Sequence, residues 1–155
     1  MKNEAIDYIK QWEHLVSDFK LLDSESDDKR LSQLLSLFGK YFELVQGVAF
    51  RRKGDEYVQI SAYAFIAEEE LSFREGEGII GQAVKDKKTV FLPNIDISYF
   101  TIVSGLGSSN KLNLLIIPLK KEGVVEVVLE LAFFKYFSEE IITKMNDLET
   151  YYFSK

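Results

Sequence analysis

A chain of 155 residues has the length of a single domain and can bury about 70% of its unfolded surface, so its core needs no disulfide or metal. It contains no cysteine, which excludes disulfides, thiolate metal sites and cysteine nucleophiles, and which favours a cytoplasmic protein. The net charge of −6, without a basic stripe, argues against a nucleic-acid partner, and no apolar run approaches the ~20 residues that span a bilayer.

Two amphipathic helices are predicted at the start of the chain, because apolar side chains recur there every three or four residues. The first stripe consists of Ala5, Ile9, Trp12, Val16 and Phe19, and the second of Leu31, Leu34, Leu35, Phe38 and Phe42. The acidic segment 23–28 between them is interpreted as a solvated linker with helix N-caps, not as a metal site. We divide the chain here into an N-terminal helix with its linker, residues 1–26, and a domain of residues 27–155.

The rest of the chain is predicted to form mainly strands. Two hairpins are indicated, one of residues 44–52 and 56–65 and one of residues 112–119 and 124–134. Between them we expect a short edge strand at 71–74, a short helix at 78–86, a strand at 89–92 that Pro93 ends, and a loop at 94–110. A last helix follows Ser138. Hairpins without a regular βαβ alternation predict an α+β fold, with an antiparallel sheet that carries helices on its faces.

Residues 76–81, Gly-Glu-Gly-Ile-Ile-Gly, match the pattern GxGxxG. In dinucleotide-binding folds this motif joins a buried strand to a helix long enough to cross the sheet. Here the preceding segment is short and half charged, and the following helix is too short. We therefore reject dinucleotide binding and predict no cofactor.

Several short segments follow one another in an order that is typical of one family. They read GEGIIGQ at 76–82, LPNI at 92–95, IVSGLG at 102–107, LLIIPL at 114–119, VLELA at 128–132 and FSEE at 137–140, preceded by QGVAF at 46–50 and YAF at 63–65. Roughly residues 27–153 thus resemble a GAF domain, the small sensory module of phosphodiesterases, phytochromes and bacterial signalling proteins. The chain is similar to the GAF domains of bacterial histidine kinases and related receptors.

The resemblance implies a GAF/profilin-like antiparallel sheet of five or six strands, with the core order 2-1-5-4-3. Terminal helices would cover one face, and a ligand pocket with short helices would lie on the other, under segment 94–110. The implied function is a sensory module of a two-component system that binds an unknown small molecule and signals to an output domain such as a histidine kinase. The alternative is a structural dimerisation scaffold with a filled pocket.

The residues argue against an enzyme. Bilin-binding members of the family and free methionine sulfoxide reductases use cysteine, which this chain lacks. The one histidine, His14, lies in the first predicted helix, outside the domain body, so neither a haem ligand nor a catalytic triad is indicated. The sequence also lacks the signature of the cyclic-nucleotide-binding members.

Candidate ligand-binding residues follow from strand alternation and from the implied pocket. On the last strand Val125, Val127, Leu129 and Leu131 share one face, which we expect to pack on the terminal helices, so that Glu130 faces the pocket. A carboxylate in mid-strand is costly to bury unpaired, so Glu130 either contacts a ligand or is a structural carboxylate held by a backbone amide or lysine. The remaining candidates, of which the aromatic ones are equally compatible with plain core, are Tyr63, Phe65, Phe91, Tyr99, Phe100, Ser104 and Ile116.

The stripes of the first and last helices also predict a homodimer. Both approximate the seven-residue repeat of helix bundles, and a single domain face is not expected to cover both. The expected contact residues are Ile9, Trp12, Val16, Phe19, Ile141, Met145, Leu148 and Tyr152.

Overall fold

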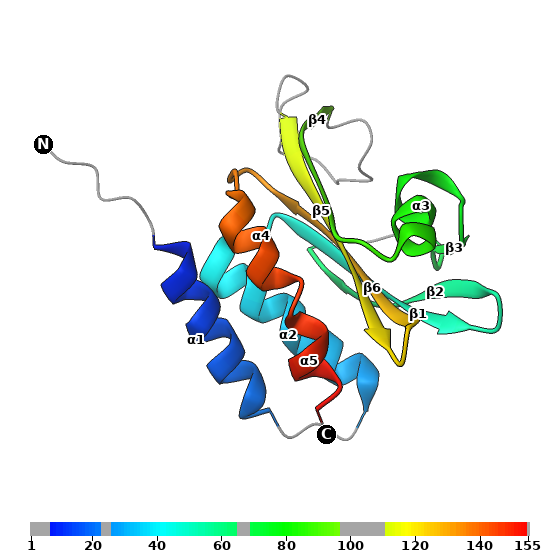
Figure 1. The fold of residues 1–155 in the computed structure, drawn as a ribbon, viewed down its shortest axis with the longest axis horizontal. Helices are drawn as coiled ribbons and strands as arrows, with labels where there is room; N and C mark the ends of the chain where they lie inside the picture. Colours follow the sequence, from blue (N-terminus) through cyan, green and yellow to red (C-terminus); the bar gives the residue numbers. More distant parts are fainter. Residues whose placement is uncertain (1–6, 23–25, 65–68, 97–110, 155) are drawn as a thin grey trace, which may run out of the picture.

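One antiparallel sheet forms the centre of the computed structural model, which describes residues 7–22, 26–64, 69–96 and 111–154 (Figure 1). Its strands are β1 (Gln46–Lys53), β2 (Glu56–Tyr63), β3 (Ser72–Arg74), β4 (Val90–Asp96), β5 (Lys111–Lys121) and β6 (Val124–Phe133). They lie in the order β3-β2-β1-β6-β5-β4. The five long strands therefore have the expected core order, and β3 extends the edge beyond β2. The α+β class and the sheet topology are confirmed.

Helices cover both faces of this sheet unequally (Figure 1). They are α1 (Tyr8–Lys20), α2 (Asp27–Phe42), α3 (Gly78–Asp86), α4 (Glu139–Met145) and α5 (Leu148–Tyr152). Helices α1, α2, α4 and α5 form a layer on one face, called the helix face below, and α3 lies on the other, called the α3 face. No helix within the described ranges is long and apolar enough to cross a membrane.

The predicted last helix is in fact two short helices. Asn146 and Asp147 form a turn between α4 and α5, in which the amide of Asp147 bonds to the carbonyl of Lys144, three residues back, at 3.0 Å. Asparagine and aspartate favour turns over helix interiors because their short side chains compete for backbone hydrogen bonds. Ile141, Met145, Leu148 and Tyr152 of the two helices are all buried in the core under the helix layer.

Strand β4 continues past Pro93, where we expected it to end. The strand lies at the edge of the sheet, so the missing amide of a proline costs no ladder hydrogen bond there. A bulge between Leu92 and Ile95 accommodates the extra residues. The side chain of the buried Asn113 holds this bulge, accepting from the amide of Asn94 at 3.0 Å and donating to the carbonyl of Lys135 at 2.6 Å.

A second bulge shifts the alternation of β6. Leu119 of β5 pairs with Val127 and Lys120 pairs with Val125, so Glu126 has no partner on β5. The expectation that Val125 shares a face with Val127 is therefore wrong, because the extra residue turns Val125 toward the α3 face. Leu129 and Leu131, beyond the bulge, pack against the helices as expected.

The stripes assigned to a dimer interface are buried inside one chain. Trp12 is 4% exposed, Ile141 1% and Met145 0%, although no second chain is present. Helix α1 packs on α2 and α4, so the helices of the layer cover one another's apolar sides. The same core buries Val16, Phe19, Leu148 and Tyr152, with Ile9 partly buried against it. The expected contact residues are therefore core residues of one chain, and the homodimer itself stays a prediction.

We predict that Trp12→Ala lowers the free energy of unfolding by about 3–5 kcal/mol, the usual cost of truncating a buried aromatic side chain. Urea denaturation measures the loss, and Glu13→Ala, at the exposed neighbouring position, is the control. Because Trp12 is buried within one chain, the midpoint should not depend on protein concentration. A midpoint that rises with concentration in the native protein, and not in the variant, would place Trp12 in an interface.

An acidic-pH prediction follows from the contact between α1 and α2. The hydroxyl of Tyr41 donates to the carboxylate of Asp18, and this hydrogen bond lowers the pKa of Asp18, with a smaller contribution from Lys40. A lowered folded-state pKa means that the stabilisation is present above the unfolded pKa of about 3.9 and is lost as the pH falls below it. Tyr41→Phe should raise the pKa of Asp18 in a carboxyl NMR titration. An unchanged titration midpoint would contradict the contact.

Candidate functional site

The α3 face has an apolar core of its own, separate from the core under the helix layer. Its buried members are Val48, Phe50, Tyr57, Phe73, Ile80, Ala83, Val84, Leu112, Leu114, Ile116, Val125, Val128 and Ala132. Strands β1, β5 and β6 contribute to both cores, because alternate side chains point to opposite faces of the sheet. A change on the α3 face therefore has a direct structural route to the helices.

The glycine motif positions α3. Gly76 and Gly78 have φ angles of +84° and +68°, a region that side chains with a Cβ rarely adopt. A Cβ on Gly81 would lie 2.6 Å from the carbonyl oxygen of Arg74, so this close packing also requires glycine. The amide of Gly76 donates to the carbonyl of Gly81 at 2.8 Å and closes the turn. Because β3 is antiparallel to β2, the motif is a tight strand-to-helix turn without a βαβ unit.

Glu130 and Ile116 lie where the sequence placed them, on the α3 face. Glu130 is opposite Ile116 on β5 and opposite Val48 on β1, and both of these neighbours belong to the α3-face core. Ile116 is fully buried, whereas Glu130 is partly exposed. The structure fixes their position, and their contact with a ligand stays a prediction. Phe65, Tyr99, Phe100 and Ser104 lie outside the described residues.

Tyr63 and Phe91 are on the wrong face for the predicted pocket. A bulge in β2 opposite Ala49 and Phe50 leaves Ile60 unpaired, and this turns Tyr63 toward the helices, where its hydroxyl group lies against Gly39. Phe91 alternates with two side chains of the α3 face and stacks edge-on against Tyr136, at 5.4 Å between ring centroids. These two aromatic rings are helix-face packing residues and cannot line a pocket with Glu130.

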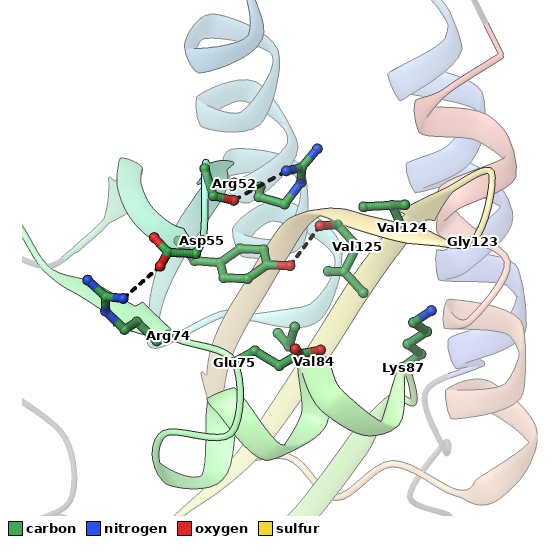
Figure 2. A pocket seen from close by; sticks show the side chains of 11 residues that line it. Arg52, Asp55, Arg74, Glu75, Val84, Lys87, Gly123, Val124 and Val125 are labelled. Atoms are coloured by element: carbon green, nitrogen blue, oxygen red, sulfur yellow. Dashed lines mark hydrogen bonds and ion pairs between the residues drawn. The ribbon is translucent and has the colours of Figure 1, made fainter.

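An open cavity of about 480 Å³ lies on the α3 face, close to the turns of both hairpins (Figure 2). Its apolar floor consists of Tyr57 from β2, Val84 from α3 and Val125 from β6. The hydroxyl of Tyr57 donates to the carbonyl of Val125 at 2.9 Å, and burial raises the pKa of Tyr57. The bulge at Glu126 is what brings Val125 into this floor.

Charged side chains from several elements surround the floor, and we call them the rim. They are Arg52 on β1, Asp55 in the first hairpin turn, Arg74 and Glu75 at and after β3, and Lys87 after α3. Two ion pairs involve rim arginines, Arg74 to Asp55 at 2.8 Å and Arg52 to Glu126 at 2.9 Å. Within the described part of the chain, Glu75 and Lys87 form no ion pair.

Sequence reasoning missed this cavity because the resemblance to GAF domains implied a pocket under segment 94–110. The available signal was the pair of short turns, Lys53-Gly54-Asp55 and Lys121-Glu122-Gly123, each directly preceded by a basic residue. Adjacent β1 and β6 bring these two turns to the same end of the sheet. The resemblance to GAF domains implied the strand order, and that order is sufficient to predict that the two turns lie together.

The side chains of the site are suited to binding a ligand rather than to reacting with it. Its walls carry guanidinium, ammonium and carboxylate groups and a phenol, around an apolar floor. His14 lies on α1 and stacks on Tyr41, with ring centroids 5.9 Å apart, on the other side of the sheet. No group of three or more metal-ligating side chains occurs among the residues that the structure describes. This arrangement suits a molecule with an apolar body and a charged edge.

The sheet order, the helix layer on one face and α3 on the other together define the GAF-domain fold. The GAF domain of A. aeolicus nlh2, in an inactive state, has 18% identity and a TM-score of 0.72, over 93% of this chain and 96% of that one. The GAF domain of a phosphoenolpyruvate-protein phosphotransferase from Coxiella burnetii has 15% identity and a TM-score of 0.70, over 95% and 90%.

The same fold also occurs in an enzyme. The free methionine-R-sulfoxide reductase of Neisseria meningitidis, solved with its substrate, has 16% identity and a TM-score of 0.72, over 97% of this chain and 91% of that one. No family model and no curated protein matches the sequence. The likeness thus establishes the fold, and the function has to be argued from the site.

We predict that Tyr57→Phe lowers the free energy of unfolding by about 0.5–1.5 kcal/mol, the net value of one hydrogen bond. Because burial raises the folded-state pKa of Tyr57 above its ordinary value of about 10, stability should also fall as the pH rises above 10, and this fall should be smaller in the variant. Urea titrations at pH 7 and pH 10.5 test both points. Tyr136→Phe, at an exposed ring, is the control, and equal behaviour of the two variants would contradict the prediction.

Proposed function

We propose that this chain is a sensory or regulatory module that binds a small molecule in the cavity on the α3 face. The observation that carries the proposal is the cavity itself, in which an apolar floor of about three side chains is surrounded by charged groups from four separate segments. A volume of about 480 Å³ lies within the range of roughly 300–1,000 Å³ typical of small-molecule sites. Likeness of fold to GAF domains of signalling proteins supports the same reading.

Contacts across the sheet give this proposal a route to the helices. Arg52 is on the rim, and its neighbour Arg51 points to the other face, where it pairs with Asp27 at the start of α2. The hydroxyl of Tyr152 on α5 donates to the same aspartate at 3.1 Å. The helix layer would then present the change to an output domain, for which a histidine kinase of a two-component system is our expectation.

The scaffold alternative is favoured by a different observation. In the middle of the α3 face, Val48, Leu114 and Ile116 are at most 1% exposed, so the sheet there is covered. Complete burial of this part of the sheet is what a structural scaffold with a filled centre and no ligand would show. The rim cavity, which lies toward the hairpin turns, is what favours the sensor.

We also propose that the chain does not catalyse a reaction. Its fold is shared with methionine-R-sulfoxide reductases, but it has no cysteine for their chemistry. The side chains around the cavity include neither a histidine nor a hydroxyl nucleophile beside a base. Incubation with free methionine-R-sulfoxide and a thiol reductant should therefore give no methionine above the blank.

A thermal-shift screen of amino acids, nucleotides, organic acids and polyamines tests the sensor proposal. A ligand at 100 times its Kd should add about 2.7 kcal/mol of stability, and the amide resonances of Tyr57 and Val125 should shift with it. Val84→Phe, which fills the floor, should abolish the effect, whereas Ile79→Phe, at a partly exposed position of the same helix, should keep it. Ligands that bind both variants equally well would place the site elsewhere and overturn the proposal.

A further inference from the structure

The ion pair between Arg52 and Glu126 spans the wall between two cavities. Both Nη2 and Nε of Arg52 donate to Oε1 of Glu126, at 2.9 and 3.3 Å. Arg52 lines the rim cavity, whereas Glu126 lines a second cavity of about 440 Å³ on the helix side. Glu126 is also the unpaired residue of the β6 bulge, so it is not fixed by a ladder partner on β5.

Cationic side chains converge on the rim cavity, although the chain as a whole is acidic. Arg52, Arg74 and Lys87 come from three segments far apart in sequence, in a protein with a net charge of −6. Lys87 forms no ion pair among the described residues, and Arg74 is held by Asp55, whose side chain is 79% exposed. The side chains of Arg52 and Glu126 are 38% and 32% exposed. Pairs of such exposure contribute little, so another anion can displace their carboxylates.

We propose that the rim cavity binds a small molecule with a carboxylate or phosphate group, and that Arg52 exchanges Glu126 for this group. The inference deepens the proposed function, on which it rests, by naming the ligand class and an internal competitor. Two donors of the planar Arg52 guanidinium now share a single carboxylate oxygen of Glu126, and the same pair of donors can bind two oxygens of a carboxylate or phosphate in the bidentate manner. The apolar part of the ligand lies on Tyr57, Val84 and Val125.

Displacement of Glu126 has a consequence on the other face of the sheet. Its released carboxylate lies in the second cavity, which Arg51, Lys121 and Arg30 also line. Arg51 forms an ion pair with Asp27, and Asp27 accepts a hydrogen bond from the hydroxyl group of Tyr152. A new carboxylate beside Arg51 competes with Asp27 and weakens the contact that ties α5 to the start of α2. Anion binding on one face is thereby coupled to the C-terminal helix on the other.

Calorimetry with the full chain tests the proposal, with citrate as the carboxylate probe, inorganic pyrophosphate as the phosphate probe and putrescine as the cationic control, all at one ionic strength. Arg52→Gln should weaken binding of at least one anion by about tenfold or more, as expected for loss of a charged hydrogen bond. Lys53→Gln, at an adjacent exposed cation that lines neither cavity, should change it by less than about twofold, because solvent and salt screen a charge that does not contact the ligand. Glu126→Gln should tighten it, because the internal competitor is removed.

Four results would overturn the proposal. Equal weakening by Arg52→Gln and Lys53→Gln would mean a general charge effect. An unchanged affinity in Glu126→Gln would mean that Glu126 does not compete with the ligand. The proposal would also be overturned if neither citrate nor pyrophosphate binds. Arg52→Lys guards against loss of the fold, because it keeps the charge and should bind with intermediate affinity. A neutral or cationic ligand that is blocked by Val84→Phe but indifferent to Arg52→Gln would overturn this inference and leave the proposed function standing.

Discussion

Burial on both faces is the constraint on which the structure depends. Residues 112–119 of β5 are buried without interruption, because helices cover one side of this strand and α3 with its neighbours covers the other. A strand in that position has no solvent side, so every side chain must be apolar or satisfied within the protein. Asn113, the polar exception, has its amide and carbonyl groups bonded to the backbone of two neighbouring segments. Glu130 on the adjacent strand also faces the α3 core, but its side chain is partly exposed.

Much of the architecture was accessible from the sequence, because helix and strand periods differ and the hairpin turns are marked by glycine. The strand order came from the resemblance to GAF domains and not from periodicity. It was harder to predict which face of the sheet each side chain occupies. Bulges at Ile60 and Glu126 reverse the alternation, and apolar side chains stand on both faces of these two strands, so the pattern carries no trace of the reversal. Tyr63 was misplaced for this reason.

The candidate site was less predictable than the fold, because it is assembled from segments that are distant in sequence. Arg52 and Glu126 are 74 residues apart, and Asp27 and Tyr152 are 125 residues apart. Charged residues in turns are usually solvated and carry no pattern that distinguishes a rim from an ordinary surface. The choice of these helix stripes as dimer contacts met a related difficulty. An apolar stripe shows that a helix is covered, but not whether its own chain covers it.

The bulge at Glu126 divides β6 into two parts that are under different structural constraints. Beyond the bulge, residues 127–133 are bound to the helix layer by a shared core, and substitutions there are constrained by packing on both faces. Before it, Val124 and Val125 belong to the turn and the cavity floor. The unpaired residue gives the turn a register of its own, so an exposed turn residue such as Val124 can be replaced without changing the register of residues 127–133. Related domains can therefore differ in the ligand that they bind while they keep the same sheet and the same helix layer.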